Sequence, residues 1–350
     1  MKTENKNLAV NFNWDNYSRN IPQDKYFLTL SCILTSFYPA SETMIPRIFD
    51  MLGLTWTMGS EKPESGWTCC SAISYHGDIM PIESLLLVAG RQWSIAREAG
   101  MEVLTPTCVT SYGNYCECKD LLEHEPGLKE EIGRLLFKTC GRELYIPEHI
   151  IHTSDIYYHY RDRIRKEFMI HQLVEAKSGQ PLKVVDHVGC HYHKLFPENV
   201  IGGTDYCDVL AGMVRAWGGV NADYPERRHC CGMGFRQCMI TPNRWATMNS
   251  VYKKFKSMLP AEPDMIITNC PGCQLFMDKM QWAIYETTGE KISIPVLTYQ
   301  EVAGLLMGWD PYDTVGIQFH TVPVEPLLDK MGIPYDEAKN VRRPMPITMV

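Results

Sequence analysis

Residues 229–234 read His-Cys-Cys-Gly-Met-Gly, and this adjacent pair of cysteines has a counterpart 161 residues earlier, at Cys69-Cys70. The cysteines that flank the two pairs repeat at nearly the same distance, 158 and 162 residues: Cys32 with Cys190, and Cys108 with Cys270. Matches this close to a single period are typical of an internal repeat. The sequence of 350 residues therefore indicates a tandem duplication.

A run of apolar and β-branched residues precedes each flanking cysteine, as is typical of a buried strand. The four runs are residues 26–30, 101–104, 182–188 and 265–268. Apolar residues recur at helical spacing between these runs, within residues 85–96 and 245–255. The alternation predicts an α/β fold with two pseudo-repeated domains, each a small parallel sheet with flanking helices. Because such sheets bind ligands at the carboxyl ends of their strands, we expect the thiols of each half to meet there.

The repeat divides the chain into four segments: a first repeat at residues 24–140, a connector at 141–180, a second repeat at 181–310 and a C-terminal arm at 311–350. The connector is rich in tyrosine, histidine and charged residues, and we expect it to be helical. Prolines punctuate the arm, which predicts an extended segment because proline interrupts helices and strands.

The composition excludes several classes of protein. A formal net charge of −7 does not provide the basic surface that nucleic-acid binding requires. The longest apolar run is far shorter than the ~18–20 residues of a membrane span, and the polar N-terminus lacks the apolar core of a signal peptide. Neither a Gly-x-Gly-x-x-Gly nor a Walker motif is present, which leaves flavin and nucleotide binding to a partner. We therefore expect a cytoplasmic protein.

The 14 cysteines are the unusual part of the composition, because thiols in a reducing compartment stay free unless a metal or a catalytic cycle holds them. The second half offers five that can act together: Cys190, Cys230, Cys231, Cys270 and Cys273. Structural zinc takes four ligands, so a fifth thiolate is surplus, and adjacent cysteines are awkward around one ion. An iron–sulfur cluster spreads its ligands over several irons. The pattern favours a cluster, with zinc and free thiols as the alternatives.

Three segments of the second half closely resemble the cysteine-rich CCG repeat that defines the B-type subunits of heterodisulfide reductase: Gly189-Cys190-His191, Cys230-Cys231-Gly232-Met233-Gly234 and Cys270-Pro271-Gly272-Cys273. The resemblance extends over roughly residues 24–305. It implies that the five second-half cysteines hold a noncubane [4Fe–4S] cluster. It also implies two CCG domains with clusters at the strand ends, and a disulfide substrate between them.

The first half departs from this pattern, because Ser111 stands where the last cysteine would fall and Ser71 stands where the glycine would follow the pair. We expect a second iron–sulfur cluster of uncertain type there, with four thiolate ligands: Cys32, Cys69, Cys70 and Cys108. Ser111, Cys116 or Cys118 remain open as a further ligand. This degenerate first repeat makes the chain similar to the B-type subunit of the heterodisulfide-reductase-like complex of sulfur oxidisers.

His191, which matches the family's Cys-His pair, is the candidate catalytic residue, because a histidine can donate a proton as a thiolate forms. His187 lies within a predicted strand, and we expect it to be structural. His229 is a weaker candidate for a hydrogen bond to a cluster sulfur. Three cysteines without a repeat partner read as buried apolar residues: Cys140, Cys207 and Cys238.

The resemblance implies an iron–sulfur catalytic subunit of a heterodisulfide-reductase-like complex, an oxidoreductase that reduces or forms a small-molecule or protein-bound disulfide. Its expected partners are a ferredoxin-like two-cluster C-type subunit and a flavin-containing A-type subunit. One alternative is a CCG-type electron-transfer subunit of a dehydrogenase or quinone-linked complex without disulfide chemistry. The other is a zinc-stapled interaction scaffold.

Overall fold

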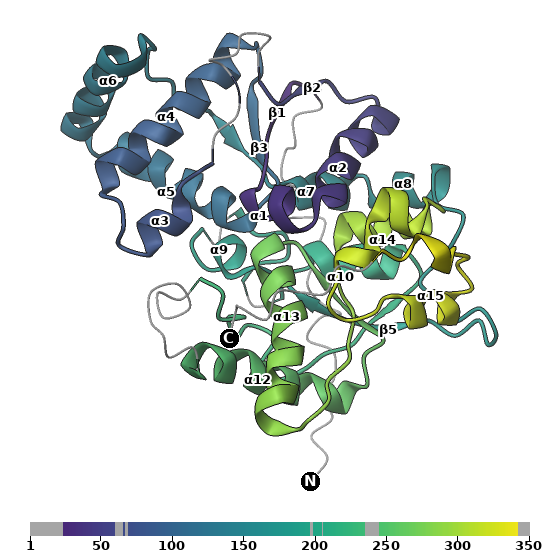
Figure 1. Ribbon diagram of the computed structural model, residues 1–350. Coiled ribbons are helices and arrows are strands. Elements are labelled where there is room, and N and C mark those ends of the chain that lie inside the picture. Colours follow the sequence, from purple (N-terminus) through teal and green to yellow (C-terminus); the bar gives the residue numbers. More distant parts are fainter. Residues whose placement is uncertain are drawn as a thin grey trace.

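The computed structural model describes residues 24–59, 66, 69–196, 199–204, 206–234 and 245–341. It has two lobes, each built on its own four-stranded sheet (Figure 1). The sheets have the strand orders β2-β1-β3-β4 and β6-β5-β7-β8, so the second repeats the topology of the first. Every pairing in both sheets is parallel. The predicted α/β fold with two pseudo-repeated units is confirmed.

The strands are short, and the two central strands of each sheet are those that the sequence predicts. The first sheet contains β1 (Tyr26–Thr29), β2 (Trp56–Thr57), β3 (Val103–Pro106) and β4 (His149–Ile150). The second contains β5 (Lys183–His187), β6 (Val220–Asn221), β7 (Met265–Thr268) and β8 (Val296–Thr298). Strands β1, β3 and β7 are fully buried, because helices cover both faces of a parallel sheet.

Helices follow the strands in both lobes. The first half carries α1 (Cys32–Phe37), α2 (Pro39–Leu52), α3 (Ala72–His76), α4 (Ile82–Glu98), α5 (Val109–His124) and α6 (Pro126–Cys140). Next come α7 (Thr153–His159) and α8 (Arg161–Glu167). The second half carries α9 (Cys190–His193), α10 (Val209–Ala216), α12 (Trp245–Met258), α13 (Pro271–Thr288), α14 (Tyr299–Leu306) and α15 (Glu325–Met331).

The lobes meet along the helices that begin at the cysteines. Helix α5 of the first lobe packs on α9 of the second, and α1 of the first lobe packs on α13 of the second (Figure 1). These contacts are equivalent under the repeat, because α1 corresponds to α9 and α5 to α13. Gly113 allows the close approach, since a Cβ atom there would lie 2.8 Å from the Cβ of His191. The two repeats therefore face each other through matching elements.

The segment after residue 310 differs from its sequence-based prediction. Instead of an extended arm, it forms short helical turns at Pro311–Val315, Ile317–Phe319 and Glu337–Lys339, together with α15. It also buries Tyr312 and Leu328, and the turn that contains Tyr312 packs on α2 of the first lobe and α14 of the second. Prolines lie in the first turn of two of these elements, where a missing N–H is tolerated. The prediction for residues 342–350 lies outside the described residues.

The predicted connector also contributes to the first sheet. Its strand β4 pairs with β3, and only then does the chain pass through α7 and α8 toward the second lobe. The expected helices are present in the second part of the connector. The domain boundaries themselves stay predictions.

Candidate metal centre

Four cysteines lie where the central strands end and the next helix begins. Cys32 and Cys190 are the first residues of α1 and α9, and Cys108 and Cys270 are the N-cap residues of α5 and α13. In each sheet the two central strands are neighbours and parallel, so their carboxyl ends bring these cysteines to one edge. The two pairs of adjacent cysteines, Cys69-Cys70 and Cys230-Cys231, lie on loops that follow the outer strands β2 and β6.

One cavity between the lobes collects all nine cysteines that the sequence singles out. Its lining includes the four from the first half, Cys32, Cys69, Cys70 and Cys108, and the five from the second half, Cys190, Cys230, Cys231, Cys270 and Cys273. Cys108 and Cys270, which are equivalent under the repeat, contact each other across the lobe boundary. The two sets of thiols are therefore adjacent parts of a single centre.

The second-half thiols form two close pairs. The Sγ atoms of Cys190 and Cys230 are 3.9 Å apart, and those of Cys231 and Cys273 are 3.3 Å apart. The thiols of Cys190 and Cys231 both interact with the thiol of Cys230, and the backbone N–H of Gly232 donates a hydrogen bond to Cys230 Sγ at 3.4 Å. These interactions lower the pKa of the Cys230 thiol. The contact between Cys190 and Cys230 raises the pKa of the Cys190 thiol. Within this set, the hydrogen bonds favour the thiolate, the form that binds metals, at Cys230.

The first-half thiols repeat this arrangement with one substitution. Hydrogen bonds from the thiols of Cys32 and Cys70 lower the pKa of Cys69, as happens at the equivalent Cys230. The Ser111 hydroxyl donates to Cys70 Sγ at 3.0 Å, where Cys273 contacts Cys231 in the second half. Ser111 therefore takes the spatial place of the fifth thiol.

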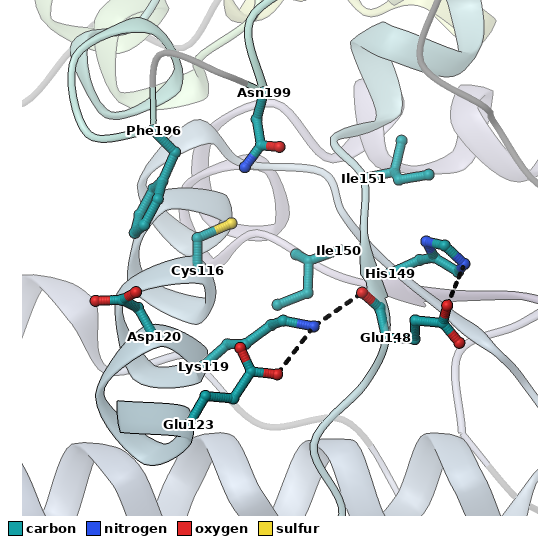
Figure 2. A pocket seen from close by; sticks show the side chains of 10 residues that line it. All are labelled: Cys116, Lys119, Asp120, Glu123, Glu148, His149, Ile150, Ile151, Phe196 and Asn199. Carbon is teal, nitrogen blue, oxygen red and sulfur yellow. Dashed lines mark hydrogen bonds and ion pairs between the residues drawn. The ribbon is translucent and has the colours of Figure 1, made fainter. Parts of the chain in front are cut away.

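The other two candidate ligands of the first half lie elsewhere. Cys116 lines a separate cavity of about 320 Å³ together with Lys119, Ile150 and Phe196 (Figure 2). Lys119 is held there by the carbonyls of Pro147 and Glu148. Cys118 is fully buried, and neither cysteine lines the cavity between the lobes. Of the three open candidates, only Ser111 lies beside the first-half thiols.

The remaining cysteines are spread through the fold. Cys207 is buried, as expected for an apolar role, whereas Cys140 is exposed at the end of α6, so the prediction that it is buried is wrong. Cys238 lies outside the described residues.

His191, the candidate catalytic residue, lines the cavity between the lobes, and it has a neighbour that the sequence does not reveal. Its ring packs edge-on against His76, at the end of α3, with 4.8 Å between the ring centroids. Both rings line the cavity, and both have a buried nitrogen without a hydrogen-bond partner among the described residues: Nδ1 of His191 and Nε2 of His76. Burial lowers the pKa of His191 and lowers that of His76 to about 4. His229 instead pairs its Nε2 with the Ser250 hydroxyl at 2.9 Å.

Lys254 of α12 is a second residue that sequence analysis misses. It is fully buried, and its Nζ donates to the carbonyls of Glu226, Arg227 and His229 at 2.8, 3.1 and 2.9 Å. These carbonyls belong to the loop that leads directly into Cys230. Burial lowers the pKa of Lys254 to about 8, and the thiols of Cys231 and Cys273 oppose that shift. The side chain therefore both braces the loop and places a positive charge near the second-half thiols.

The donor set fits an iron–sulfur group. Sulfur atoms dominate the lining of the cavity, and no carboxylate is among the residues that line it in the described part of the chain. Soft thiolate donors without carboxylates favour iron–sulfur clusters or zinc over hard cations. Five thiols that include an adjacent pair exceed what one tetrahedral zinc ion binds. The residues present therefore fit a cluster better than a single ion.

Comparisons with known proteins agree with this geometry. Residues 184–278 match the cysteine-rich CCG domain. The chain is 28% identical over 318 residues to the B-type subunit of the ferredoxin:CoB-CoM heterodisulfide reductase of Methanosarcina acetivorans, which covers 90% of this chain and 98% of that protein. It is 24% identical over 299 residues to a heterodisulfide reductase B-type protein of Archaeoglobus profundus, which covers 84% and 94%.

A third relative comes from a different type of complex. The chain is 26% identical over 294 residues to the 8-methylmenaquinol:fumarate reductase membrane anchor subunit of Wolinella succinogenes, which covers 82% of this chain and 93% of that protein. Within the described residues of this chain, no helix is both long and apolar enough to cross a membrane.

A solved structure shares the fold. A hypothetical protein from Helicobacter pylori matches with a TM-score of 0.60 at 11% identity, over 87% of this chain and 53% of that chain. The domain match at the second-half cysteines and the near full-length similarities agree with each other. The chain is a relative of the B-type subunits of heterodisulfide reductase and carries a cysteine-rich CCG domain.

Proposed function

We propose that the chain is the iron–sulfur catalytic subunit of a heterodisulfide-reductase-like complex, and that it reduces or forms a disulfide. The domain match and the named relatives support the broader class, an iron–sulfur electron-transfer subunit of an oxidoreductase. The observation that carries the finer proposal is the single cavity into which the cysteines of both repeats converge.

In this proposal, Cys190, Cys230, Cys231, Cys270 and Cys273 hold a noncubane [4Fe–4S] cluster. Cys32, Cys69, Cys70 and Cys108 hold a second cluster, with Ser111 beside them. Bound clusters supply electrons one at a time, and breaking a disulfide requires two electrons and two protons to give two thiols. Two thiol sets that touch through Cys108 and Cys270 provide two adjacent one-electron centres for that stoichiometry.

The protein's own groups would bind the substrate and supply protons. Apolar side chains in the lining, Ile33, Ile73, Val109 and Met233, limit water around the reacting sulfurs. The buried Nδ1 of His191 is free to carry the proton that a product thiolate accepts. His76 packs against the His191 ring and restricts its orientation.

The partners in this proposal are a ferredoxin-like two-cluster C-type subunit, which delivers electrons, and a flavin-containing A-type subunit that precedes it in the electron path. The relatives of the B type imply a complex of several subunits. We further propose that the complex is of the type found in sulfur oxidisers, because of the degenerate first repeat. The cytoplasmic location remains a prediction from the sequence.

A second candidate is an electron-transfer subunit without disulfide chemistry. The similarity to the membrane anchor subunit of a fumarate reductase favours it. A zinc-stapled scaffold has less support, because the fifth thiol of the second half exceeds the needs of zinc.

Electron paramagnetic resonance distinguishes the two redox candidates. The protein is purified without oxygen, its iron and acid-labile sulfide are measured, and it is titrated with a thiol and with a disulfide. We expect a brown protein and a paramagnetic signal that appears only with the substrate thiol. A colourless, iron-free protein contradicts both redox candidates. Normal reduction by a carrier protein without any response to thiol or disulfide supports the relay instead.

The proton donor can be tested separately. We expect His191→Ala to slow turnover while the iron content stays at the wild-type level. His149→Ala is the control, because the His149 side chain is 41% exposed and does not line the cavity between the lobes. Loss of iron together with activity in His191→Ala would show that the ring is structural.

A further inference from the structure

His187 is the last residue of β5 and lies three positions before Cys190. Its side chain is only 1% exposed, and in the sheet it pairs with Thr268 of β7. A histidine in a buried central strand reads as structural from sequence alone. A structural histidine, however, should have hydrogen-bond partners.

The His187 ring has none among the described residues, because Nδ1 and Nε2 are both buried without a partner. Two other buried histidines differ. Nδ1 of His152 lies 2.7 Å from the Ser154 hydroxyl, and Nε2 of His320 lies 3.2 Å from a Glu301 carboxylate oxygen. A neutral imidazole always carries one N–H, and a buried donor left without an acceptor is rare in folded proteins. The ring is therefore positioned for an acceptor that the described part of the polypeptide does not provide.

The nearest metal-binding groups identify that acceptor. One ring nitrogen of His187 and the Sγ atoms of Cys231 and Cys273 all lie within 4.8 Å of one another. His187 is not among the residues that line the open cavity, so it approaches these sulfurs from the protein side.

The first repeat has a different group at this position. Thr29, the last residue of β1, stands 158 residues earlier, the same offset that relates Cys32 to Cys190. Its hydroxyl is also buried without a partner among the described residues, but it is much shorter than an imidazole. The histidine is therefore specific to the half with five thiols.

We propose that His187 donates a ring N–H hydrogen bond to a sulfur atom of the iron–sulfur group held by the second-half cysteines, and that this bond raises the group's reduction potential. The inference rests on the proposed function. Hydrogen bonds to cluster sulfurs raise the potential because they stabilise the more negative, reduced state. His187 is a positioning residue in this role, and it transfers neither a proton nor an electron.

The test compares His187→Leu, which removes the donor, with His187→Gln, which keeps an N–H in a side chain of similar reach. The purified holoprotein is titrated electrochemically while its paramagnetic signals are recorded. We expect His187→Leu to make reduction of the second-half group about tenfold less favourable, a downward shift of about 59 mV for a one-electron couple. We expect His187→Gln to restore most of that shift. Thr29→Val is the matched control and should leave the second-half signal unchanged.

Each outcome has a definite meaning. Loss of iron in His187→Leu with full iron in His187→Gln also supports the proposal, because the donor is the main difference between the two side chains. An unchanged potential in His187→Leu overturns it, as does a strong nitrogen coupling typical of direct ligation to iron. In those cases the iron–sulfur group is present and titrates. Failure of the proposed function shows differently, either as a protein without iron or as a group that is reduced normally but does not respond to thiol or disulfide.

Discussion

The two halves of the molecule have the same topology but different thiol sites. Each lobe has a four-stranded parallel sheet whose central strands end at a cysteine, and each delivers an adjacent cysteine pair on a loop. In the second half a fifth cysteine, Cys273, completes the set, and Lys254 and His187 lie close to the sulfurs. In the first half Ser111 takes the fifth position, and Thr29 replaces the histidine.

This difference shows that the fold and the chemistry of the site are separable. The strand ends place two sulfurs per half and the loops after the outer strands place two more, whatever the fifth ligand is. The residue at the fifth position and the polar groups behind the sulfurs then set which group binds and at what potential. We therefore expect the two halves to respond differently to equivalent substitutions.

The largest effect is expected when the second half is made like the first. Cys273→Ser removes the thiol that lies 3.3 Å from Cys231. We expect disulfide turnover to fall by at least about 100-fold, because loss of even an outer-shell group at a metal site costs roughly 10- to 100-fold. Turnover and the second-half paramagnetic signal are the measurements.

The reciprocal change sharpens this comparison. Ser111→Cys should give the first half a signal that resembles the second-half signal, with more iron bound per chain. Cys207→Ser is the control, because Cys207 is buried outside the cavity. Turnover that survives Cys273→Ser would refute the view that the fifth thiol distinguishes the halves.

Lys254→Met tests the buried positive charge beside the second-half thiols. Three carbonyls before Cys230 lose their donor, and we expect a loss of about 2–3 kcal/mol in the free energy of unfolding, as for hydrogen bonds to a charged group. Urea denaturation measures this change. The second-half potential should also fall, since a nearby positive charge is lost. Lys253→Met is the control, because that side chain is 61% exposed. Equal effects from both variants would contradict the proposed role.

Gly113→Ala tests the packing between the halves. A Cβ atom would lie 2.8 Å from His191 Cβ and 3.0 Å from the His191 carbonyl oxygen, so α9 and Cys190 must shift. We expect a loss of about 1–3 kcal/mol, as for overpacked cores. Gly133→Ala in α6 is the control, because a Cβ there meets only Leu144 at 3.8 Å and should stabilise the helix. The denaturation midpoints of the two variants should therefore move in opposite directions.

The smallest effect concerns acid stability. Burial, and then the neighbouring His191, lower the pKa of His76 to about 4 in the folded chain, from an ordinary value near 6.5. Between these values the unfolded chain binds a proton that the folded chain does not, so stability falls as the pH drops from about 6.5 to about 4. His76→Phe should flatten that part of the stability profile. An unchanged slope would show that His76 protonates freely in the folded chain.

The sequence predicts the parts of the fold that have a periodic or repeated signal. The central strands β1, β3, β5 and β7 lie in runs rich in apolar and β-branched residues, and eight of the nine cysteines follow one period. The edge strands β2, β4 and β6 have two residues each, which is too short for a detectable pattern.

The polar neighbours of the thiols could not be predicted in the same way. Lys254 lies in a charged stretch of helix that reads as a solvated face, and its acceptors come from a loop 25–28 residues away. His76 and His191 come from different halves, and they meet because α3, which ends at His76, and α9, which contains His191, both pack on α5. Contacts between distant segments leave no trace in local sequence patterns.

The contact between Cys108 and Cys270 has a consequence for how the protein matures. Each thiol belongs to the wall of the neighbouring metal-binding set, so filling one set fixes an atom of the other in place. Uptake of iron and sulfide by one repeat should therefore favour uptake by the other repeat. Chains with only one of the two thiol sets occupied should be scarce at every stage of assembly.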